Sequence, residues 1–280
     1  MNTFRADLHC HSTCSDGSKT PEQIIQLAKE SGLSALSITD HDSIDAYTTA
    51  VEYAKKEGIT LLPGVEFSAT LEGHSVHILG YGFSLDSRSI ADLCTRHADR
   101  REKRNGAMLK SLSEHGMPLT NDELIAALPP GLQHTIGRPH IALAMMKKGY
   151  VTSIQEAFNK YLGEEKLCYV QGIEIGVDET IAAIHQGKGI AVLAHPHLIK
   201  NEQLTRKLLK EPFDGLECYY GKFYHDAHQH WLKLAKKHDL LITGGSDYHG
   251  DIKPNLNLGC SWINAELFQA IQDKITLLNT

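Results

Sequence analysis

Histidine and acidic side chains recur in this sequence at spacings that suit metal binding. The segment Asp7-Leu8-His9-Cys10-His11 places two imidazoles two residues apart, and in an extended segment such residues point to the same face. Two imidazoles on one face can bind one ion, because imidazole is the commonest metal ligand among side chains. By itself, this pair does not distinguish a metal site from histidines that are only hydrogen-bonded at a strand end.

Further candidate ligands lie at or near the ends of the strands that we expect later in the chain. Together with the first pair they make a set of nine, namely His9, His11, Asp16, His41, Glu66, His77, His195, Asp247 and His249. Nine nitrogen and oxygen ligands exceed what one ion requires, so we expect a multinuclear site for Mn²⁺, Fe²⁺ or Zn²⁺. No cysteine belongs to the set, which argues against a structural thiolate zinc site.

Closely spaced divalent ions favour phosphoester hydrolysis. They lower the pKa of a bridging water toward neutrality, and the resulting hydroxide can attack phosphorus in line. We therefore assign catalytic roles to Glu66, Asp247 and His195. No serine or cysteine nucleophile is needed, and Cys10 and Cys14 are interpreted as packed neighbours.

The elements that must position these residues alternate between strands and helices. We expect strands at Thr3–His9, Leu33–Ile38, Ile59–Val65, Val76–Tyr81, Ile190–Ala194, Asp214–Cys218 and Leu240–Thr243. We expect helices from Thr20 to Gly32, at Ser43–Glu57, Asp178–Gln186 and Tyr224–His238. Short parallel strands that alternate with helices imply a barrel or a doubly wound sheet, and barrel enzymes assemble their sites where the strands end.

A stretch at residues 87–166 contains only helical patterns and interrupts this alternation. Within it, Arg96 to Lys148 carries nine basic and five acidic residues, a net charge of +4, which leaves −10 for the rest of the chain. A basic lid over an acidic body would hold a phosphate against bound metal ions. The alternative is that Arg100-Arg101-Glu102-Lys103-Arg104 is only the solvated face of a long helix.

Composition excludes several other classes. The chain has 280 residues, 41% of them hydrophobic, and a net charge of −6, so no overall basic excess draws it to nucleic acid or to an acidic membrane. Its six cysteines form no CxxC pair, which favours a reducing cytoplasm. Without an apolar leader or a long apolar run, we expect no secretion and no membrane partner.

The motifs His9-x-His11, Asp16-Gly17, Thr39-Asp40-His41, Gly64-Val65-Glu66, His77, Ala194-His195-Pro196 and Ser246-Asp247-x-His249 resemble the PHP (polymerase and histidinol phosphatase) family. The resemblance implies a distorted (β/α)7 TIM-like barrel, formed by residues 1–86 and 167–280, with residues 87–166 as an inserted helical subdomain that caps the substrate. It also implies a trinuclear centre, with Mn²⁺ as the expected metal. One ion would take His9, His11, Glu66 and Asp247, a second would share Glu66 and take His77 and His195, and the third would take Asp16, His41 and His249.

Within that family, the insertion with Gly137-Arg138-Pro139-His140 and the segment from Phe158 to Val170 resemble one branch. Its members remove the 3′-phosphate of nucleoside 3′,5′-bisphosphates such as pAp, and some trim RNA from a 5′-monophosphate end. The resemblance thus implies a nucleotide or short RNA as the substrate partner. Members of this branch vary around Arg138 and at the residue after Ala194-His195-Pro196, here His197, so the pocket can be tuned differently.

Four residues are our candidates for substrate binding: Arg138, His140, His134 and His197. Arg138 offers a bidentate fork to a phosphate, with a helix-surface arginine as the alternative. His140 and His134 could reach the same phosphate or be structural, and His197 could protonate the leaving alkoxide. Phe158 and Tyr169 could stack on a base, although a core role is the simpler interpretation.

Other polar residues are assigned supporting or surface roles. Asp7, Asp40 and Asp42 flank the candidate ligand histidines and could accept the second imidazole N–H, with simple surface or capping roles as the alternative. Glu217, at a strand end, could support a ligand or bind the substrate. The histidines at 225, 228 and 230 are interpreted as an exposed helix face.

Alternative functions remain at this stage. A related enzymatic function is that of a histidinol phosphatase or another small phosphomonoesterase. A function of a different class is that of a non-catalytic metal-dependent binding module. A polymerase-associated proofreading domain is disfavoured by the length, and C–N bond hydrolysis by the basic segment. No obligate protein partner is inferred, and the oligomeric state stays open.

Overall fold

The computed structural model describes residues 3–128, 136–221 and 227–280. The chain begins with β1 (Ala6–Cys10), α1 (Pro21–Glu30), β2 (Ala35–Ile38), α2 (Tyr47–Glu57) and β3 (Thr60–Leu61). The expected start of α1 is found: Thr20 and Gln23 form a reciprocal capping box ahead of Pro21. α2 ends at Gly58, which adopts a left-handed φ of 74°.

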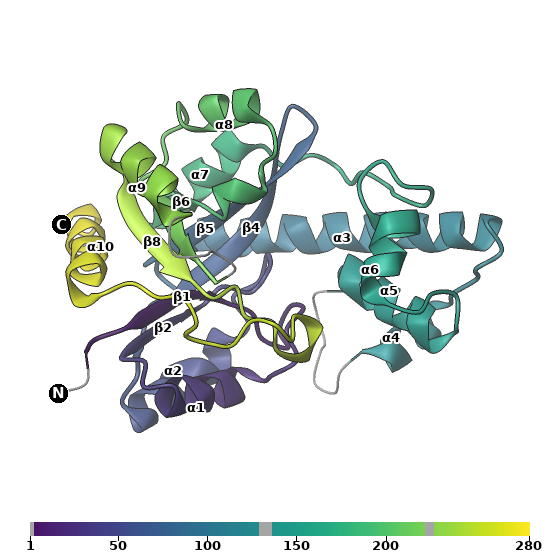
Figure 1. Cartoon of the computed structure of the whole chain (residues 1–280), viewed down its shortest axis with the longest axis horizontal. Helices are drawn as coiled ribbons and strands as arrows, with labels where there is room; N and C mark the ends of the chain where they lie inside the picture. Colours follow the sequence, from purple (N-terminus) through teal and green to yellow (C-terminus); the bar gives the residue numbers. More distant parts are fainter. Residues whose placement is uncertain (1–2, 129–135, 222–226) are drawn as a thin grey trace.

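Two sheets form the body of the molecule (Figure 1). β1, β2 and β3 make a parallel three-stranded sheet. The second sheet has the order β4 (Gly64–Leu71), β5 (His74–Tyr81), β6 (Ile190–Leu193), β7 (Gly215–Tyr220) and β8 (Leu241–Gly245). β6, β7 and β8 are parallel, whereas β5 runs antiparallel to both of its neighbours. The alternation of strands and helices establishes an α/β fold.

The antiparallel β5 corrects our expectation of parallel strands only. Between β4 and β5 the turn contains two residues, Glu72 and Gly73, with φ of 51° and 80°. Two positive φ values are typical of a type I′ hairpin turn, and so short a turn can connect only antiparallel strands. The expected strand from Ile59 to Val65 is also divided, because Pro63, which has no backbone N–H, separates β3 from β4.

The expected TIM-like barrel is not confirmed, because the regular ladders of the described residues do not close into one sheet. Isolated parallel bridges join the two sheets at two places, Cys10 with Tyr248 and His41 with Glu66. The register also shifts within β1 and β7, where the pairing skips residues.

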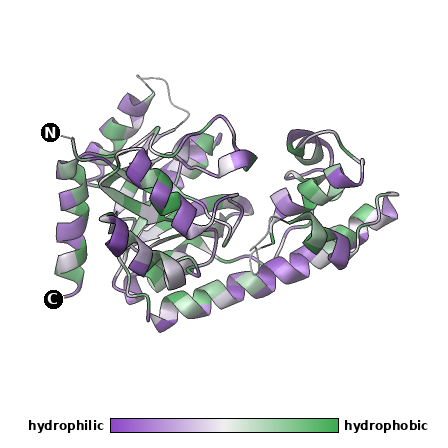
Figure 2. Ribbon diagram, turned by 90° about the horizontal axis from the view of Figure 1, so that it is seen from below, coloured by the Kyte–Doolittle hydropathy of each residue, from purple (hydrophilic) through white to green (hydrophobic). Residues whose placement is uncertain are grey.

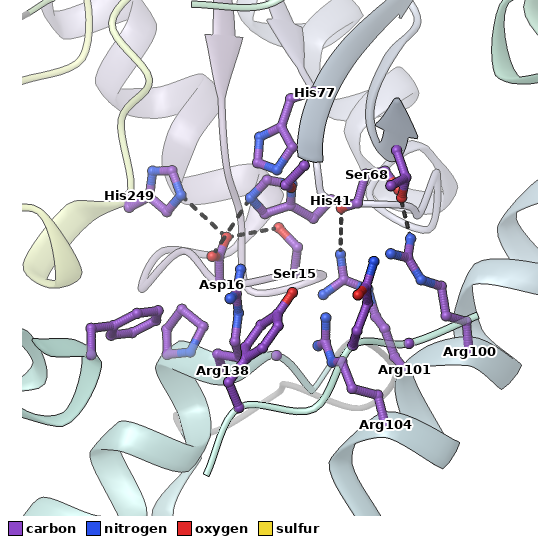
Figure 3. Close-up of a pocket in the computed structure, with 18 of the residues that line it drawn as sticks. Ser15, Asp16, His41, Ser68, His77, Arg100, Arg101, Arg104, Arg138 and His249 are labelled. Atoms are coloured by element: carbon purple, nitrogen blue, oxygen red, sulfur yellow. Dashed lines mark hydrogen bonds and ion pairs between the residues drawn. The ribbon is translucent and has the colours of Figure 1, made fainter. Parts of the chain in front are cut away.

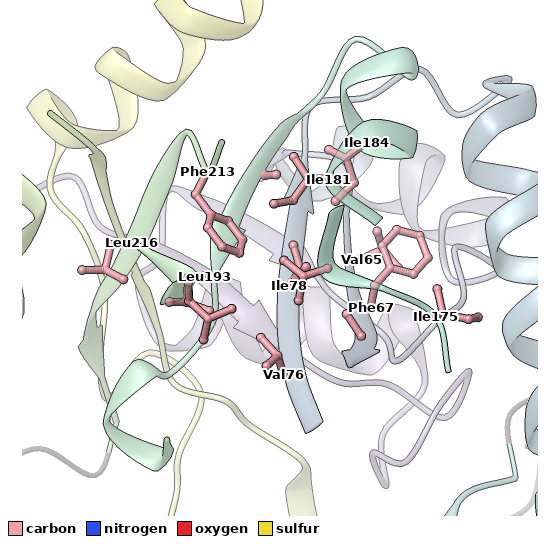
Figure 4. Close-up of a cluster of buried hydrophobic side chains, with 14 of the residues drawn as sticks. Val65, Phe67, Val76, Ile78, Ile175, Ile181, Ile184, Leu193, Phe213 and Leu216 are labelled. Atoms are coloured by element: carbon pink, nitrogen blue, oxygen red, sulfur yellow. The ribbon is translucent and has the colours of Figure 1, made fainter. Parts of the chain in front are cut away.

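Helices cover the sheets. α7 (Val177–Gln186) packs on the face of the five-stranded sheet, with α8 (Glu202–Leu208) and α9 (His228–Lys237) beside it, and α10 (Ala265–Leu278) ends the chain. Figure 4 shows the core beneath α7, in which Ile181 and Ile184 meet Val65, Phe67 and Ile78. Short 3-10 turns, η2 (Pro196–Leu198) and η3 (Gly250–Ile252), follow β6 and β8. No helix among the described residues is long and apolar enough to cross a membrane.

The interrupting stretch is helical, as expected. It begins with the long α3 (Arg88–Glu114) and continues through α4 (Asn121–Ala127), α5 (Arg138–Lys147), α6 (Ile154–Ala157) and a π-helical turn, η1 (Phe158–Leu162). The far half of α3 packs with the later helices around a core of its own, which includes Met108, Leu112 and Met145. Figure 2 shows the hydrophilic middle of α3 between this core and the body. The division into two subdomains stays a prediction.

Two helix boundaries differ from expectation. α2 begins at Tyr47 rather than Ser43, because residues 44–46 form turns in which Tyr47 donates to the carbonyl of Ile44. α9 begins at His228 rather than Tyr224, and residues 222–226 lie outside the described part. The expectation for His225 therefore also lies outside it.

Candidate metal centre and substrate cavity

The structure brings all nine candidate ligands together at the junction of the two sheets. Their ligand atoms form four overlapping groups within 4.8 Å, each able to hold an ion. One group is His11, Asp16, His41 and His249, and it contains the three residues that the family resemblance assigns to one ion. The others are His9 with His11 and Asp247, His9 with Glu66 and His195, and His41 with Glu66 and His77.

Glu66 lies at the centre of these groups. Its Oε1 lies 2.8 Å from both His77 Nδ1 and His195 Nε2. Its Oε2 lies 3.1 Å from His11 Nε2 and from His41 Nδ1. Burial alone raises the pKa of Glu66, but the imidazoles of His41 and His77 outweigh it and hold that pKa well below the usual range. Glu66 is therefore a carboxylate shared among several imidazoles, as a bridging ligand must be.

The turn that carries Asp16 depends on a glycine. Asp16 Oδ1 lies 3.3 Å from His249 Nε2, and its Oδ2 lies 3.8 Å from His41 Nε2. A Cβ at the next residue, Gly17, would lie 2.1 Å from the carbonyl oxygen of His11. Only glycine allows this close approach, which brings Asp16 back over His11.

Asp247 divides its two oxygens between different neighbours. Its Oδ1 faces three imidazoles, at 3.6 Å from His9, 3.4 Å from His11 and 3.4 Å from His249. Its Oδ2 accepts hydrogen bonds from the Tyr220 hydroxyl at 2.6 Å and from Lys253 Nζ at 2.7 Å. Asp247 has a left-handed φ of 52°, which aspartate tolerates better than most residues. Oδ1 is thus the oxygen that faces the candidate ion site.

The donor set fits divalent ions. His9 Nε2, His11 Nε2 and His41 Nδ1 are buried and have no hydrogen-bond partner among the described residues. Burial lowers the pKa of His41 to about 3, so its imidazole is neutral near pH 7 and can donate its lone pair. Buried ring nitrogens that face carboxylate oxygens without hydrogen bonds are what a metal site provides.

Glu217 contacts the candidate ligand His9 on the side of its ring that faces away from the candidate ion site. Its Oε1 lies 2.8 Å from His9 Nδ1, and its Oε2 accepts the backbone N–H of His195 at 2.7 Å. This places the ring proton of His9 on Nδ1 and leaves Nε2 toward the ion site. The sequence left Glu217 open as a group that supports a ligand or binds substrate, and this contact favours the first role.

The flanking aspartates act differently from our hypothesis, because none is hydrogen-bonded to the ring of the adjacent ligand histidine. Asp7 accepts backbone N–H groups of His9, Ser246 and Gly259. Asp40 accepts from Ser12 and Ser15, in the turn before Asp16. Asp42 accepts from Ser68 and from the guanidinium of Arg101 on α3. These carboxylates hold the backbone around the ligands rather than their rings.

A cavity of about 250 Å³ opens beside the candidate ligands. Asp16, His41, His77 and His249 line one wall (Figure 3). Four arginines line the opposite wall: Arg100, Arg101 and Arg104 from α3, and Arg138 from the start of α5. The run at residues 100–104 is therefore not only a solvated helix face, because its arginines turn toward the cavity and only Glu102 and Lys103 are exposed.

The arginines are held by specific contacts. Arg100 donates to the carbonyl of Ser68 at 2.7 Å, and Arg101 donates through Nε to Asp42 Oδ2 at 2.8 Å. Burial, together with the charges of Arg101 and Arg138, lowers the pKa of Arg104 to about 9. Within the described part of the chain, Arg101 is the one of the four that has a carboxylate partner, so the wall has an excess of positive charge that suits an anion.

Of the four residues that we expected to bind substrate, Arg138 lines the cavity, whereas His140 and His197 do not. Arg138 lies over the rings of Phe158 and Tyr169, at 5.8 and 5.5 Å, and both aromatics line the cavity. Phe158 also packs against the core of the helical stretch, as the simpler interpretation expected. His140 is buried, accepts the N–H of Gly137 and does not line the cavity. His197 also lies outside the lining, with its ring 4.4 Å from that of Tyr220. His134 falls outside the described residues.

Lys253 lines the cavity but was not among our candidates. The motif Ser246-Asp247-x-His249 drew attention to the ligands, and a lysine four residues beyond it carries no signal of its own.

Comparison with known proteins places this geometry among metal-dependent phosphoesterases. A family model described as PHP domain matches residues 7–252. The chain is 33% identical over 266 residues to a 5′-3′ exoribonuclease from Haemophilus influenzae, with 93% of each chain covered. It is 29% identical over 248 residues to a 3′,5′-nucleoside bisphosphate phosphatase from Chromobacterium violaceum, a match that covers 87% of this chain and 86% of that protein. A crystal structure from Bifidobacterium adolescentis, provisionally described as a metal-dependent phosphoesterase, matches with a TM-score of 0.86 and 30% identity over 98% of this chain and 97% of that one.

Proposed function

This chain belongs to the PHP domain family, and we propose that it hydrolyses the 3′-phosphate of nucleoside 3′,5′-bisphosphates such as pAp. The observation that carries this proposal is the cavity with two unlike walls. One wall offers imidazoles and carboxylates for divalent ions. The other offers four arginines, and among the residues that the structure describes only Arg101 has a carboxylate partner. A substrate with a phosphate at each end of a nucleoside would satisfy both walls at once.

Each residue has a defined task in this mechanism. Three Mn²⁺ ions, with Fe²⁺ or Zn²⁺ as alternatives, would be held by the nine ligands; when bound, they lower the pKa of a coordinated water and neutralise charge on the phosphoryl oxygens. Glu66 and Asp247 hold the ligand imidazoles at fixed positions, and Glu217 fixes the tautomer of His9. Arg138 binds the second phosphate and so orients the 3′ ester toward the ligand wall.

A second activity, removal of nucleotides from a 5′-phosphorylated RNA end, uses the same arrangement. The terminal nucleotide of such an RNA also carries a 5′-phosphate and a phosphoester at its 3′ oxygen. Phe158 and Tyr169, which flank Arg138 in the cavity, offer faces for a base. The relative from Haemophilus influenzae, named for this activity, supports it.

The alternatives fit the cavity less well. Histidinol phosphate carries one phosphate and a cationic amine, and the arginine wall would repel the amine. A non-catalytic binding module has no use for a complete set of ligands whose nitrogens face carboxylates.

All six cysteines are free, which supports a location in the reducing cytoplasm.

The test is phosphate release by Mn²⁺-loaded protein from pAp, 5′-AMP, 3′-AMP, histidinol phosphate and a short 5′-phosphorylated RNA. We expect pAp to be preferred over 3′-AMP. Arg138→Met should reduce kcat/KM for pAp by roughly 10- to 100-fold, the loss of a charged hydrogen bond, and change 3′-AMP much less. Arg88→Met, at an arginine whose side chain is 93% exposed, is the matched control. Equal rates on pAp and 3′-AMP, or a preference for histidinol phosphate, would overturn the substrate assignment.

A further inference from the structure

Lys253 extends a positive charge to the candidate metal centre from the loop after β8. It follows η3 directly, and its Nζ lies 2.7 Å from Oδ2 of the candidate ligand Asp247. It lines the same cavity as Asp16, His41 and His249, and its side chain is 33% exposed, against 4% for that of Asp247. The lysine therefore lies at the surface of the ligand cluster that faces a substrate.

The contact with Asp247 does not use the whole ammonium group. Asp247 Oδ2 also accepts a hydrogen bond from the Tyr220 hydroxyl at 2.6 Å, so Lys253 is not its sole donor. A lysine ammonium has three N–H donors, and Asp247 takes one of them. Tyr220 does not line the cavity, whereas Lys253 does. Two donors thus meet on one oxygen, and only one of them also reaches the cavity.

The backbone that carries Lys253 is fixed to the turn of the ligand Asp16. Ser18 Oγ accepts the N–H of Asp251 at 2.8 Å, and the Ser18 N–H donates to the carbonyl of His249 at 3.1 Å. The N–H of Lys253 donates to Gly250, and its carbonyl accepts from Leu256. The stem of the side chain therefore starts from a defined point, while its four methylenes allow the ammonium to move over a short distance.

We propose that Lys253 is a substrate-binding residue that donates to an oxygen of the phosphoryl group under attack. This inference rests on the proposed function and deepens it, because it assigns a protein cation to the phosphate at the ligand wall, opposite the arginines that take the other phosphate. The compact ammonium of Lys253 suits a phosphoryl oxygen. Because this donor is already in place beside Asp247, it can stabilise the negative charge on that oxygen while the phosphoester is hydrolysed.

The test compares two substitutions that each remove one hydrogen bond from Asp247 Oδ2. Lys253→Met removes the donor that reaches the cavity, and Tyr220→Phe removes the one that does not. In Mn²⁺-loaded protein we expect Lys253→Met to lower kcat/KM for pAp by about 10- to 100-fold and to weaken inhibition by inorganic phosphate by at least about tenfold. Tyr220→Phe should leave phosphate inhibition within about threefold of the unchanged protein, and Lys253→Arg should restore part of it.

Manganese binding separates this role from simple support of Asp247. Because the positive charge of Lys253 beside Asp247 repels a nearby cation, Lys253→Met should bind Mn²⁺ as tightly as the unchanged protein or more tightly, as measured by titration and by metal content after dialysis. If Lys253→Met and Tyr220→Phe lose Mn²⁺ and activity alike, Lys253 only positions Asp247 and the proposal is wrong. If the unchanged protein hydrolyses no phosphoester, the proposed function fails, and calorimetric binding of phosphate to the Mn²⁺-loaded variants still tests Lys253.

Discussion

The ion pair between Asp42 and Arg101 connects the ligand loop to α3, and its contribution can be measured. Asp42 follows the candidate ligand His41 and accepts hydrogen bonds from the Ser68 N–H at 2.7 Å and from Arg101 Nε at 2.8 Å. The side chains of Asp42 and Arg101 are 1% and 12% exposed, so water screens the pair less than a surface pair. Asparagine keeps the shape and tolerates the φ of 56° at this position, so Asp42→Asn removes mainly the charge.

The loss of unfolding free energy that we expect for Asp42→Asn lies between the values for an exposed and for a buried ion pair. Exposed pairs contribute up to about 1 kcal/mol, and removal of one partner of a buried pair costs about 3 to 5 kcal/mol. For a pair with one partner slightly exposed we expect Asp42→Asn to lower the free energy of unfolding by about 2 to 3 kcal/mol at pH 7. At about 2 to 4 °C per kcal/mol for a chain somewhat smaller than this one, Tm should fall by roughly 4 to 12 °C.

The pH dependence follows from the pKa of Asp42. Burial alone raises it, but the charges of Arg101 and His97 outweigh burial and hold the pKa well below the usual range. A carboxyl whose pKa is lowered on folding stabilises the protein above its unfolded pKa, about 3.9, and loses this contribution as the pH falls toward the folded value. The stability difference between the unchanged protein and Asp42→Asn should therefore be constant from pH 5 to 7 and shrink below about pH 4.

A double-mutant cycle with Arg101→Gln tests the reasoning. Urea denaturation of the two single variants and the double variant should give a coupling free energy of about 1 to 2 kcal/mol, because the second substitution removes a partner already lost. Arg96→Gln, at an exposed arginine of α3 that pairs with Glu179, is the control for a surface pair. Additive effects within about 0.5 kcal/mol would refute the view that this pair joins the loop to the helix.

Four further predictions follow from other contacts. Glu66→Ala should lose bound metal and nearly all activity while its circular dichroism stays unchanged; full turnover with Mn²⁺ would contradict the shared-carboxylate model. Glu217→Gln should weaken Mn²⁺ binding by about 10- to 100-fold in a chelator competition, because the tautomer of His9 is no longer fixed; unchanged affinity, with exposed Glu202→Gln as control, would count against it. Gly17→Ala should lose metal, because its Cβ would lie 2.1 Å from the His11 carbonyl oxygen; a variant with normal metal content would show that the turn can shift. Gly106→Ala, where a Cβ meets no atom within 4 Å, should raise the free energy of unfolding by about 0.5 to 1 kcal/mol in urea titrations; a loss of stability would mean that α3 bends there.

The candidate ligands could be selected from the sequence because each belongs to a local pattern, and their binding of ions stays a prediction. His9 and His11 share a strand face by spacing alone, and Asp247 and His249 follow a short apolar run. The helix start at Thr20 was equally local, since a capping box needs only four residues. The hairpin at Glu72-Gly73 was missed because the sequence lacks the Asn-Gly or Asp-Gly signal that usually marks a type I′ turn.

Other features depend on contacts between distant segments and leave no local trace. Asp42 was expected to support His41, yet it pairs with Arg101, 59 residues away. Lys253 reaches Asp247 because a loop turns back over the Asp16 turn, a long-range arrangement that spacing does not encode.

The placement of the arginines on α3 argues for a preformed cavity rather than a lid that closes. Near its start, Ile90 and Leu93 are buried in the core of the body, and near its end Met108 and Leu112 are buried in the core of the helical stretch. At 1.5 Å per residue, its 27 residues span about 40 Å, so one continuous helix is anchored at both ends with the arginines between. A rigid-body closure would have to separate one of these cores or bend the helix. The distance between the arginine wall and the ligand wall is therefore fixed by packing, and the length of a substrate that can reach both walls is fixed with it.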